Sequence, residues 1–255
     1  MEFVVISSKP GNQKTAICFS GQLRTWRNCI ETYRNIILPD ADIFCHIWDY
    51  NTSPNWITDN KNPDIINNTE IQDIIEILKP KKYMIENYRP MKPINSNQLI
   101  IYHGYLSQFY GIMRAAKLKK EYEIEHDLQY DVVARARYDS FFISKIIDYY
   151  KAVKSKTIHG FHFGWDTSKN IGRMGDIYWF AESRTYDVIS DFYLNIASID
   201  PDKTFYTSDM PPEFLFFHYL KKNHILIENN YWDIKVFRKN IDESFSKSKT
   251  GFEIW

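Results

Sequence analysis

Two arginines and an aspartate alternate along one short segment, residues 130–139, whose sequence is YDVVARARYD. Successive side chains of an extended strand point to opposite faces, so Arg135, Arg137 and Asp139 are expected to share one face. Two guanidinium groups are costly to bury unless carboxylates or an anion such as phosphate accompany them. A strand that ends at Asp139 would present these groups at the carboxyl edge of a sheet, where open α/β sheets bind ligands.

The elements that must position these residues alternate between strand and helix. Apolar runs predict strands over residues 15–20, 42–48, 82–86, 131–137, 157–164, 176–181 and 224–228. Apolar residues at helical spacing predict helices over 23–37, 69–78, 99–116, 184–195 and 211–222, with loops over 51–68 and 89–97. The alternation in the first half predicts an α/β fold with a mostly parallel central sheet flanked by helices.

Length and composition favour one domain over residues 1–255. We expect a nucleotide-binding half at 15–139, an acceptor half at 140–238 and a loose tail at 239–255. The formal net charge is zero, which gives no basic excess to attract nucleic acid.

The cysteine pattern and the apolar runs indicate the cellular compartment of the protein. Cys18, Cys29 and Cys45 fit neither a disulfide framework nor a zinc site. The first residues do not resemble a secretory signal, and no run approaches the roughly 20 apolar residues of a membrane span. We therefore expect a cytoplasmic protein without a transmembrane segment, with Cys18, Cys45 and His46 in its core.

Four segments, in order along the chain, resemble glycosyltransferases of the GT-A type, particularly small enzymes of bacterial and viral polysaccharide synthesis. They are 16–24 (AICFSGQLR), 41–48 (ADIFCHIW), 130–139, and 175–181 (GDIYWFA) followed by 211–215 (PPEFL). The resemblance implies a single GT-A-like domain. It also implies transfer of a hexosyl or pentosyl group from a nucleotide-diphosphate sugar to a glycan acceptor.

In enzymes of this type the first strand and its loop hold the nucleotide, which implies a donor site at Ser20, Gly21, Gln22 and Arg24. The residue types agree, because a glycine turn exposes backbone N–H groups and arginine pairs with phosphate. The alternative is an ordinary turn between a strand and a helix.

The family holds Mn²⁺ or Mg²⁺ with an Asp-x-Asp motif, but this chain has Arg137-Tyr138-Asp139 and keeps only the second carboxylate. Asp139 could still ligate a hard cation if phosphates and waters complete the site. Arg135 and Arg137 could instead neutralise the diphosphate without a metal. A third possibility is a structural ion pair, either Arg137–Asp139 or Arg135–Asp131.

Three carboxylates are candidates for the base that deprotonates the acceptor. The resemblance implies Asp176 near the sugars and Glu213 at the start of a buried helix, and Asp209 competes with Glu213. Each also has a structural interpretation, as a turn cap or as a favourable charge in a first helical turn.

Two other classes of protein remain open. A non-catalytic carbohydrate-binding protein of the same fold would bind glycan without turnover, and the missing first aspartate favours it. A nucleotidyltransferase would bind a nucleoside triphosphate, but the chain lacks a glycine-rich basic loop for that.

Overall fold

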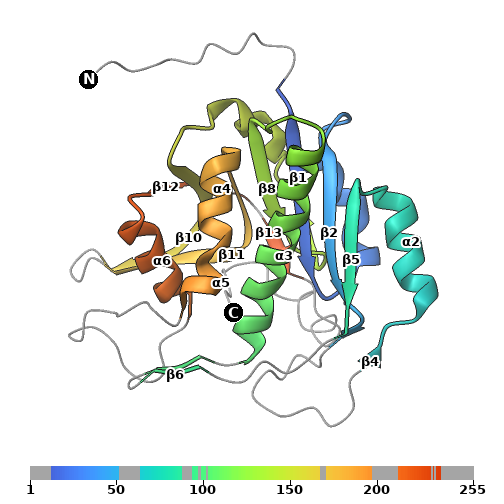
Figure 1. Cartoon of the computed structure of the whole chain (residues 1–255), viewed down its shortest axis with the longest axis horizontal. Coiled ribbons are helices and arrows are strands. Elements are labelled where there is room, and N and C mark those ends of the chain that lie inside the picture. Colours follow the sequence, from blue (N-terminus) through green and yellow to red (C-terminus); the bar gives the residue numbers. More distant parts are fainter. Residues whose placement is uncertain are drawn as a thin grey trace, which may run out of the picture.

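The structure, a computed structural model, describes residues 13–51, 64–87, 94–96, 99–101, 103–166, 171–196, 212–230, 232 and 234–236. Its centre is a seven-stranded sheet in the order β12-β10-β11-β8-β1-β2-β5 (Figure 1). The strands are β1 (Thr15–Gly21), β2 (Asp42–Trp48), β5 (Lys82–Glu86), β8 (Val132–Ala136), β10 (Thr157–Asp166), β11 (Ile171–Ala181) and β12 (Leu226–Asn229). Four neighbouring pairs are parallel, and β11 runs antiparallel to both β8 and β10. The predicted α/β class with a mostly parallel sheet is confirmed.

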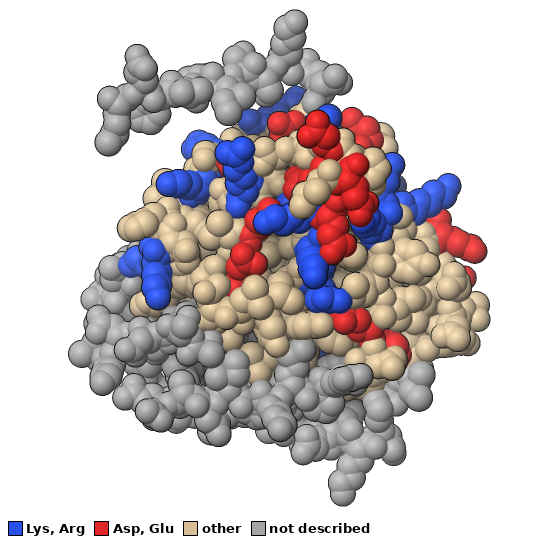
Figure 2. All heavy atoms as spheres, in the orientation of Figure 1, with Lys and Arg blue, Asp and Glu red and all other residues tan. Residues whose placement is uncertain are grey.

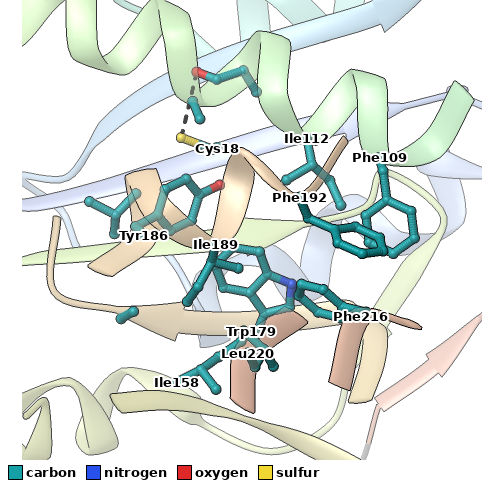
Figure 3. Packing of buried hydrophobic residues seen from close by; sticks show 14 of the residues in the cluster. Cys18, Phe109, Ile112, Ile158, Trp179, Tyr186, Ile189, Phe192, Phe216 and Leu220 are labelled. Carbon is teal, nitrogen blue, oxygen red and sulfur yellow. Dashed lines mark hydrogen bonds between the residues drawn. The ribbon is translucent and has the colours of Figure 1, made fainter. Parts of the chain in front are cut away.

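Helices cover both faces of this sheet. One apolar core joins the sheet to α3 (His103–Glu125), α4 (Ser183–Ser190), α5 (Phe192–Asn195) and α6 (Pro212–Lys222), and we call this side the α3 face (Figure 3). The second core joins the opposite face to α1 (Trp26–Cys29), η1 (Ile30–Asn35), α2 (Asn68–Leu78) and η2 (Ile146–Ala152). Three small ribbons complete the described elements: β3 (Tyr50–Asn51) with β4 (Asp64–Ile65), β6 (Ile94–Ser96) with β7 (Leu99–Ile101), and β9 (Ser140–Phe142) with β13 (Ile234–Val236).

Two predicted helices differ from the structure. The helix expected over 23–37 is a four-residue α-helix continued by a 3₁₀ helix. The hydroxyl of Thr32 donates to the carbonyl of Cys29 at 2.7 Å, a local bond of the kind that competes with a regular helix. The helix expected from Leu99 begins at His103, because residues 99–101 form β7 and pair with β6 in the segment expected as a loop. The sequence Leu99-Ile100-Ile101 favours a strand since isoleucine is β-branched.

The long helix α3 approaches the sheet closely at Gly111. A Cβ added there would lie 3.1 Å from Nδ1 of His46 and 3.6 Å from Cβ of Ser20. His46 is fully buried, and so are Cys18 and Cys45, as the sequence predicted. A side chain at position 111 would therefore crowd Ser20 of β1 and His46 of β2.

The two predicted halves of the chain share one sheet, because β10, β11 and β12 join it beside β8. The expected tail at 239–255 lies outside the described residues. No helix among the described residues is both long enough and apolar enough to cross a membrane. Figure 2 shows acidic and basic side chains interspersed over the face that α3 covers.

Candidate functional site

The parallel strands β1, β2, β5 and β8 end at the same edge of the sheet. From β1 the sheet extends to β2 and β5 on one side and to β8 on the other. Open α/β sheets bind ligands where the strand order reverses in this way, outside the carboxyl ends of the strands. The turns that follow β1 and β8 are therefore the candidate site (Figure 1).

The turn after β1 has an unusual backbone. Gly21 has a φ of +125° and Arg24 has a φ of +48°. The left-handed region is costly for a residue with a Cβ, so other contacts must hold Arg24 in place. Its Nε donates to Oε1 of Gln22 at 2.9 Å, and its Nη1 donates to Oδ2 of Asp139 at 3.0 Å.

The turn after β8 carries two of the predicted residues. The strand ends at Ala136, so Arg137 and Asp139 lie beyond it and do not share a strand face with Arg135, contrary to our expectation. Asp139 accepts hydrogen bonds from Nε of Arg137 at Oδ1 and from Nη2 of Arg137 at Oδ2, both at 2.8 Å. Such bidentate, charge-assisted pairs are among the strongest polar contacts in proteins.

Aromatic residues of the second core hold this turn in place. The hydroxyl of Tyr33 donates to the carbonyl of Tyr138 at 2.5 Å. The ring of Tyr138 is fully buried and stacks on Phe19 with ring centroids 5.4 Å apart. The positions of Arg137 and Asp139 are thus set by packed aromatic residues.

Asp176 of β11 extends the ion pairs across the edge. Its Oδ2 lies 3.6 Å from Nη1 of Arg137. Arg24, Asp139, Arg137 and Asp176 form a chain of alternating charge that we call the edge network; two cations and two anions leave it with no net charge. Burial alone would raise the pKa of Asp139, but Arg137 and Arg24 outweigh burial and hold that pKa well below its usual range.

Arg135 is not one of the ion-paired residues of the edge network, although the charges of Asp176, Arg137 and Asp139 act on it. It sits inside β8 on the α3 face, paired in the sheet with Cys18 of β1 and Trp179 of β11, and only 1% of its surface is exposed. Within the described part of the chain its Nε and Nη1 have no hydrogen-bond partner. Burial lowers the pKa of Arg135 to about 10 against the opposing effect of Asp176, so the group stays cationic at neutral pH. The predicted Arg135–Asp131 pair is absent from the described contacts, and Oδ2 of Asp131 accepts from the backbone N–H of Lys14 at 2.8 Å.

Other buried polar groups on the α3 face also lack partners among the described residues. They include the Ser20 hydroxyl and Nε2 of Gln108. Ser20 is registered with His46 on the neighbouring strand, and both lie under Gly111. Amide and guanidinium nitrogens are donors and a hydroxyl can donate, so the unpaired groups are mainly hydrogen-bond donors. Buried donors of this kind suit a ligand rich in acceptors, such as an oxyanion.

The three candidate bases lie at different places along the chain, and the structure describes two of them. Asp176 joins the edge network through Arg137. Glu213 lies in the first turn of α6 and is partly exposed. Asp209 lies outside the described residues. None of these positions tests the catalytic role, which stays a prediction.

The donor set does not fit a divalent cation at Asp139. Both of its oxygens accept hydrogen bonds from guanidinium groups, and a cation there would lie against Arg24 and Arg137. The described residues contain no group of three or more His, Cys, Asp or Glu side chains that could hold a metal. Hard cations take several oxygen ligands, so the contacts give no support to the predicted metal role, which stays untested.

A second polar cluster, which the sequence interpretation missed, lies where β2 and β5 end. Oε2 of Glu86 lies 2.9 Å from Nε2 of His46 and 3.2 Å from Nε of Arg114, and Oε1 accepts from the Tyr110 hydroxyl at 3.1 Å. Burial lowers the pKa of His46, and the contact with Glu86 opposes this. Glu86 is the last residue of its strand, the same signal that drew attention to Asp139.

Comparisons with known proteins give structural likeness only. No protein-family model and no curated protein matches the chain. The apo form and a second crystal structure of glycosyltransferase GlyE from Streptococcus pneumoniae TIGR4 are similar, with TM-scores of 0.40 and 0.42 and sequence identities of 10% and 9%. The matches cover 86% and 85% of this chain but 46% and 45% of theirs, so this chain spans less than half the length of those structures. Likeness at this level carries no argument about function, which the geometry of the site alone can support.

Proposed function

We propose that this chain is a glycosyltransferase that moves a hexosyl or pentosyl group from a nucleotide-diphosphate sugar to a hydroxyl of a glycan acceptor. The fold contributes an open, mostly parallel sheet. Its strand order reverses between β1 and β8, and we call this place the switch point. Gly21, Arg24, Arg137, Asp139 and Asp176 gather there, which is the place where such sheets hold nucleotides. Polysaccharide synthesis is the process that the sequence resemblance favours.

Arg135 is the observation that carries the proposal. A buried guanidinium whose Nε and Nη1 have no partner among the described residues loses hydration at those atoms without gaining hydrogen bonds in exchange. A bound oxyanion would supply the missing acceptors and add to the negative charge of Asp176. The diphosphate of a nucleotide sugar is such an anion, and negative charge grows on it as the glycosidic bond breaks.

The roles of the remaining residues follow from their charges. The edge network is neutral, so Arg24 and Arg137 attract a diphosphate weakly unless Asp139 releases them. We assign them the task of holding the turns after β1 and β8, with Arg135 as the main anion contact. Ser20, Gly21 and Gln22 would border the nucleotide. One carboxylate among Asp176, Asp209 and Glu213 would accept the proton of the acceptor hydroxyl.

A panel of nucleotide sugars tests the proposal. The protein is incubated with each donor and a mixed glycan acceptor, and free nucleoside diphosphate is measured with Mn²⁺, with Mg²⁺ and with a chelator. We expect release from at least one donor and a rise in melting temperature with its nucleoside diphosphate, because a ligand that binds only the folded state stabilises it. Activity that survives the chelator supports the arginine-based site, and activity that the chelator abolishes returns a metal role to Asp139.

A non-catalytic carbohydrate-binding protein is the second candidate. It is favoured by the contacts of Asp139, whose two oxygens accept three hydrogen bonds from Arg24 and Arg137, so a metal there would lie against two cations. Binding of nucleotide sugar or glycan without release of nucleoside diphosphate would support it. If no donor releases nucleoside diphosphate and no nucleoside diphosphate raises the melting temperature, the result counts against both candidates.

A further inference from the structure

The outermost strand at one side of the sheet has a sequence that complements itself. β5 reads Lys82-Tyr83-Met84-Ile85-Glu86, with a cation at one end, an anion at the other and apolar residues between. Within the described residues it pairs with β2 alone (Figure 1). The outer side of such a strand offers backbone N–H and C=O groups to any strand that can lie beside it.

One face of β5 leaves its apolar side chains in contact with solvent. Tyr83 is 49% exposed and Ile85 is 40% exposed, and both point away from α3 because side chains alternate along a strand. Ile77, near the end of the helix that leads into β5, is 53% exposed. Tyr83 and Ile85 are neighbours on one face of β5, and adjacent exposed apolar residues mark interaction surfaces more often than singly exposed ones do.

We propose that two copies of this chain associate by antiparallel pairing of β5 with β5 about a twofold axis at Met84. In this register Lys82 faces Glu86 of the partner subunit, and Tyr83 faces Ile85 of the partner subunit. The twofold axis repeats both contacts on the other side, as an isologous interface requires. The two seven-stranded sheets then become one continuous sheet.

The pairing pattern distinguishes a second copy from other occupants. Opposite charges that face each other across two strands are stabilising, and like charges are destabilising. Parallel pairing would place Lys82 against Lys82 of the partner subunit. A one-residue slip would bring Tyr83 opposite Met84 of the partner subunit and turn the apolar face of one strand away from that of the other.

The opposite edge of the sheet lacks this symmetry. β12 reads Leu226-Ile227-Glu228-Asn229 and has an acidic residue but no basic one. Its Leu226 is 68% exposed, more than any apolar residue of β5. Exposure at a sheet edge is therefore common to both edges, whereas self-complementary charge belongs to β5. Lys82 and Glu86 also have partners within the chain, but their side chains keep 24% and 25% exposure and so can reach across the edge.

Sedimentation velocity over a range of protein concentrations tests the association. We expect a dimer that dissociates on dilution, and a monomer at every concentration for Ile85→Lys. The matched control is Leu226→Lys, which places the same charge on the other edge and should leave the dimer intact. A wild-type protein that stays monomeric, an assembly that grows beyond two chains, or a dimer unaffected by Ile85→Lys would each overturn the proposal.

Disulfide trapping tests the register, and it does not depend on the stability of a single variant. Residue 83 of one subunit directly faces residue 85 of its partner, within the roughly 4.4–6.8 Å Cα separation that a disulfide spans. Diagonal neighbours lie about 7–8 Å apart. The double variant Tyr83→Cys, Ile85→Cys should form a cross-linked dimer on mild oxidation, and either single variant should not. The native cysteines, Cys18, Cys29 and Cys45, are buried and should not interfere. Equal cross-linking of a single variant would show another register and refute this one.

Discussion

Arg137 and Asp139, only two residues apart, form a bidentate ion pair in which both carboxylate oxygens accept hydrogen bonds of 2.8 Å. The pair lies just beyond the end of β8, and the Asp139 side chain keeps 2% of its exposure. Arg24 adds a third bond from a segment 115 residues away. The carboxylate thus ties together the two turns that flank the switch point of the sheet.

Asp139→Asn should destabilise the fold strongly. The change leaves Arg24 and Arg137 without their shared anion, and breaking a buried ion pair on one side typically costs about 3–5 kcal/mol. Urea denaturation measures the free energy of unfolding. Asp73→Asn is the control, because its pair with Arg27 has 37% and 54% side-chain exposure and should be worth about 1 kcal/mol or less. Equal losses for the two variants would contradict a special role for the edge network.

Arg135→Met should separate ligand binding from stability. A buried cation with unpartnered donors costs free energy, so an apolar residue of similar length is expected to leave the free energy of unfolding unchanged or to raise it by about 1–2 kcal/mol. The same variant should lose the rise in melting temperature that nucleoside diphosphates produce. Urea denaturation gives the free energy of unfolding, and differential scanning fluorimetry with and without nucleotide gives the change in melting temperature.

The control for this experiment is Arg27→Met, which removes a surface arginine and should keep the nucleotide response. Suppose instead that Arg135→Met lowers the free energy of unfolding by several kcal/mol and binds nucleotide normally. Arg135 would then have a structural role, and the proposed anion site would be wrong.

His46 should make stability depend on pH in the weakly acidic range. Burial lowers the pKa of His46 below its unfolded value of about 6.5. The unfolded state therefore binds more protons, and the folded state is favoured as pH rises. The stabilisation is fully present above about pH 6.5 and is lost as pH falls through the lower, folded pKa. Free energies of unfolding between about pH 7.5 and about pH 5.5 should fall for the wild type and change less for His46→Gln.

Lys119 should be a major stabilising residue of the α3 face. Its fully buried ammonium donates to Glu123 at 2.9 Å, to Ser183 at 2.7 Å and to Asp187 at 2.6 Å. Lys119→Met would leave Glu123 without its cation and Asp187 with only the 3.7 Å contact to Lys120, at a cost of about 3–5 kcal/mol in urea denaturation. Lys154→Met is the control, since its contact with Glu228 is 67% and 39% exposed. A loss below about 1 kcal/mol at Lys119 would show that the network contributes little.

The sequence by itself determined where charge would follow an apolar strand. The run Val132 to Ala136 is buried throughout, and the charged residues after it could only emerge at the carboxyl edge. The alternation of strands and helices likewise determined the α/β class, because period and chain order are properties of the sequence alone.

Only the tertiary structure decided which charges meet. Arg24 and Asp139 pair across 115 residues. Asp131 accepts from the backbone N–H of Lys14, while Nε and Nη1 of Arg135 have no partner among the described residues. The physical reason is that alternation along a strand gives the face of a side chain but not the residue at which the strand stops. Because β8 ends at Ala136, Arg137 and Asp139 lie in the turn that follows, whereas Arg135 stays inside the strand.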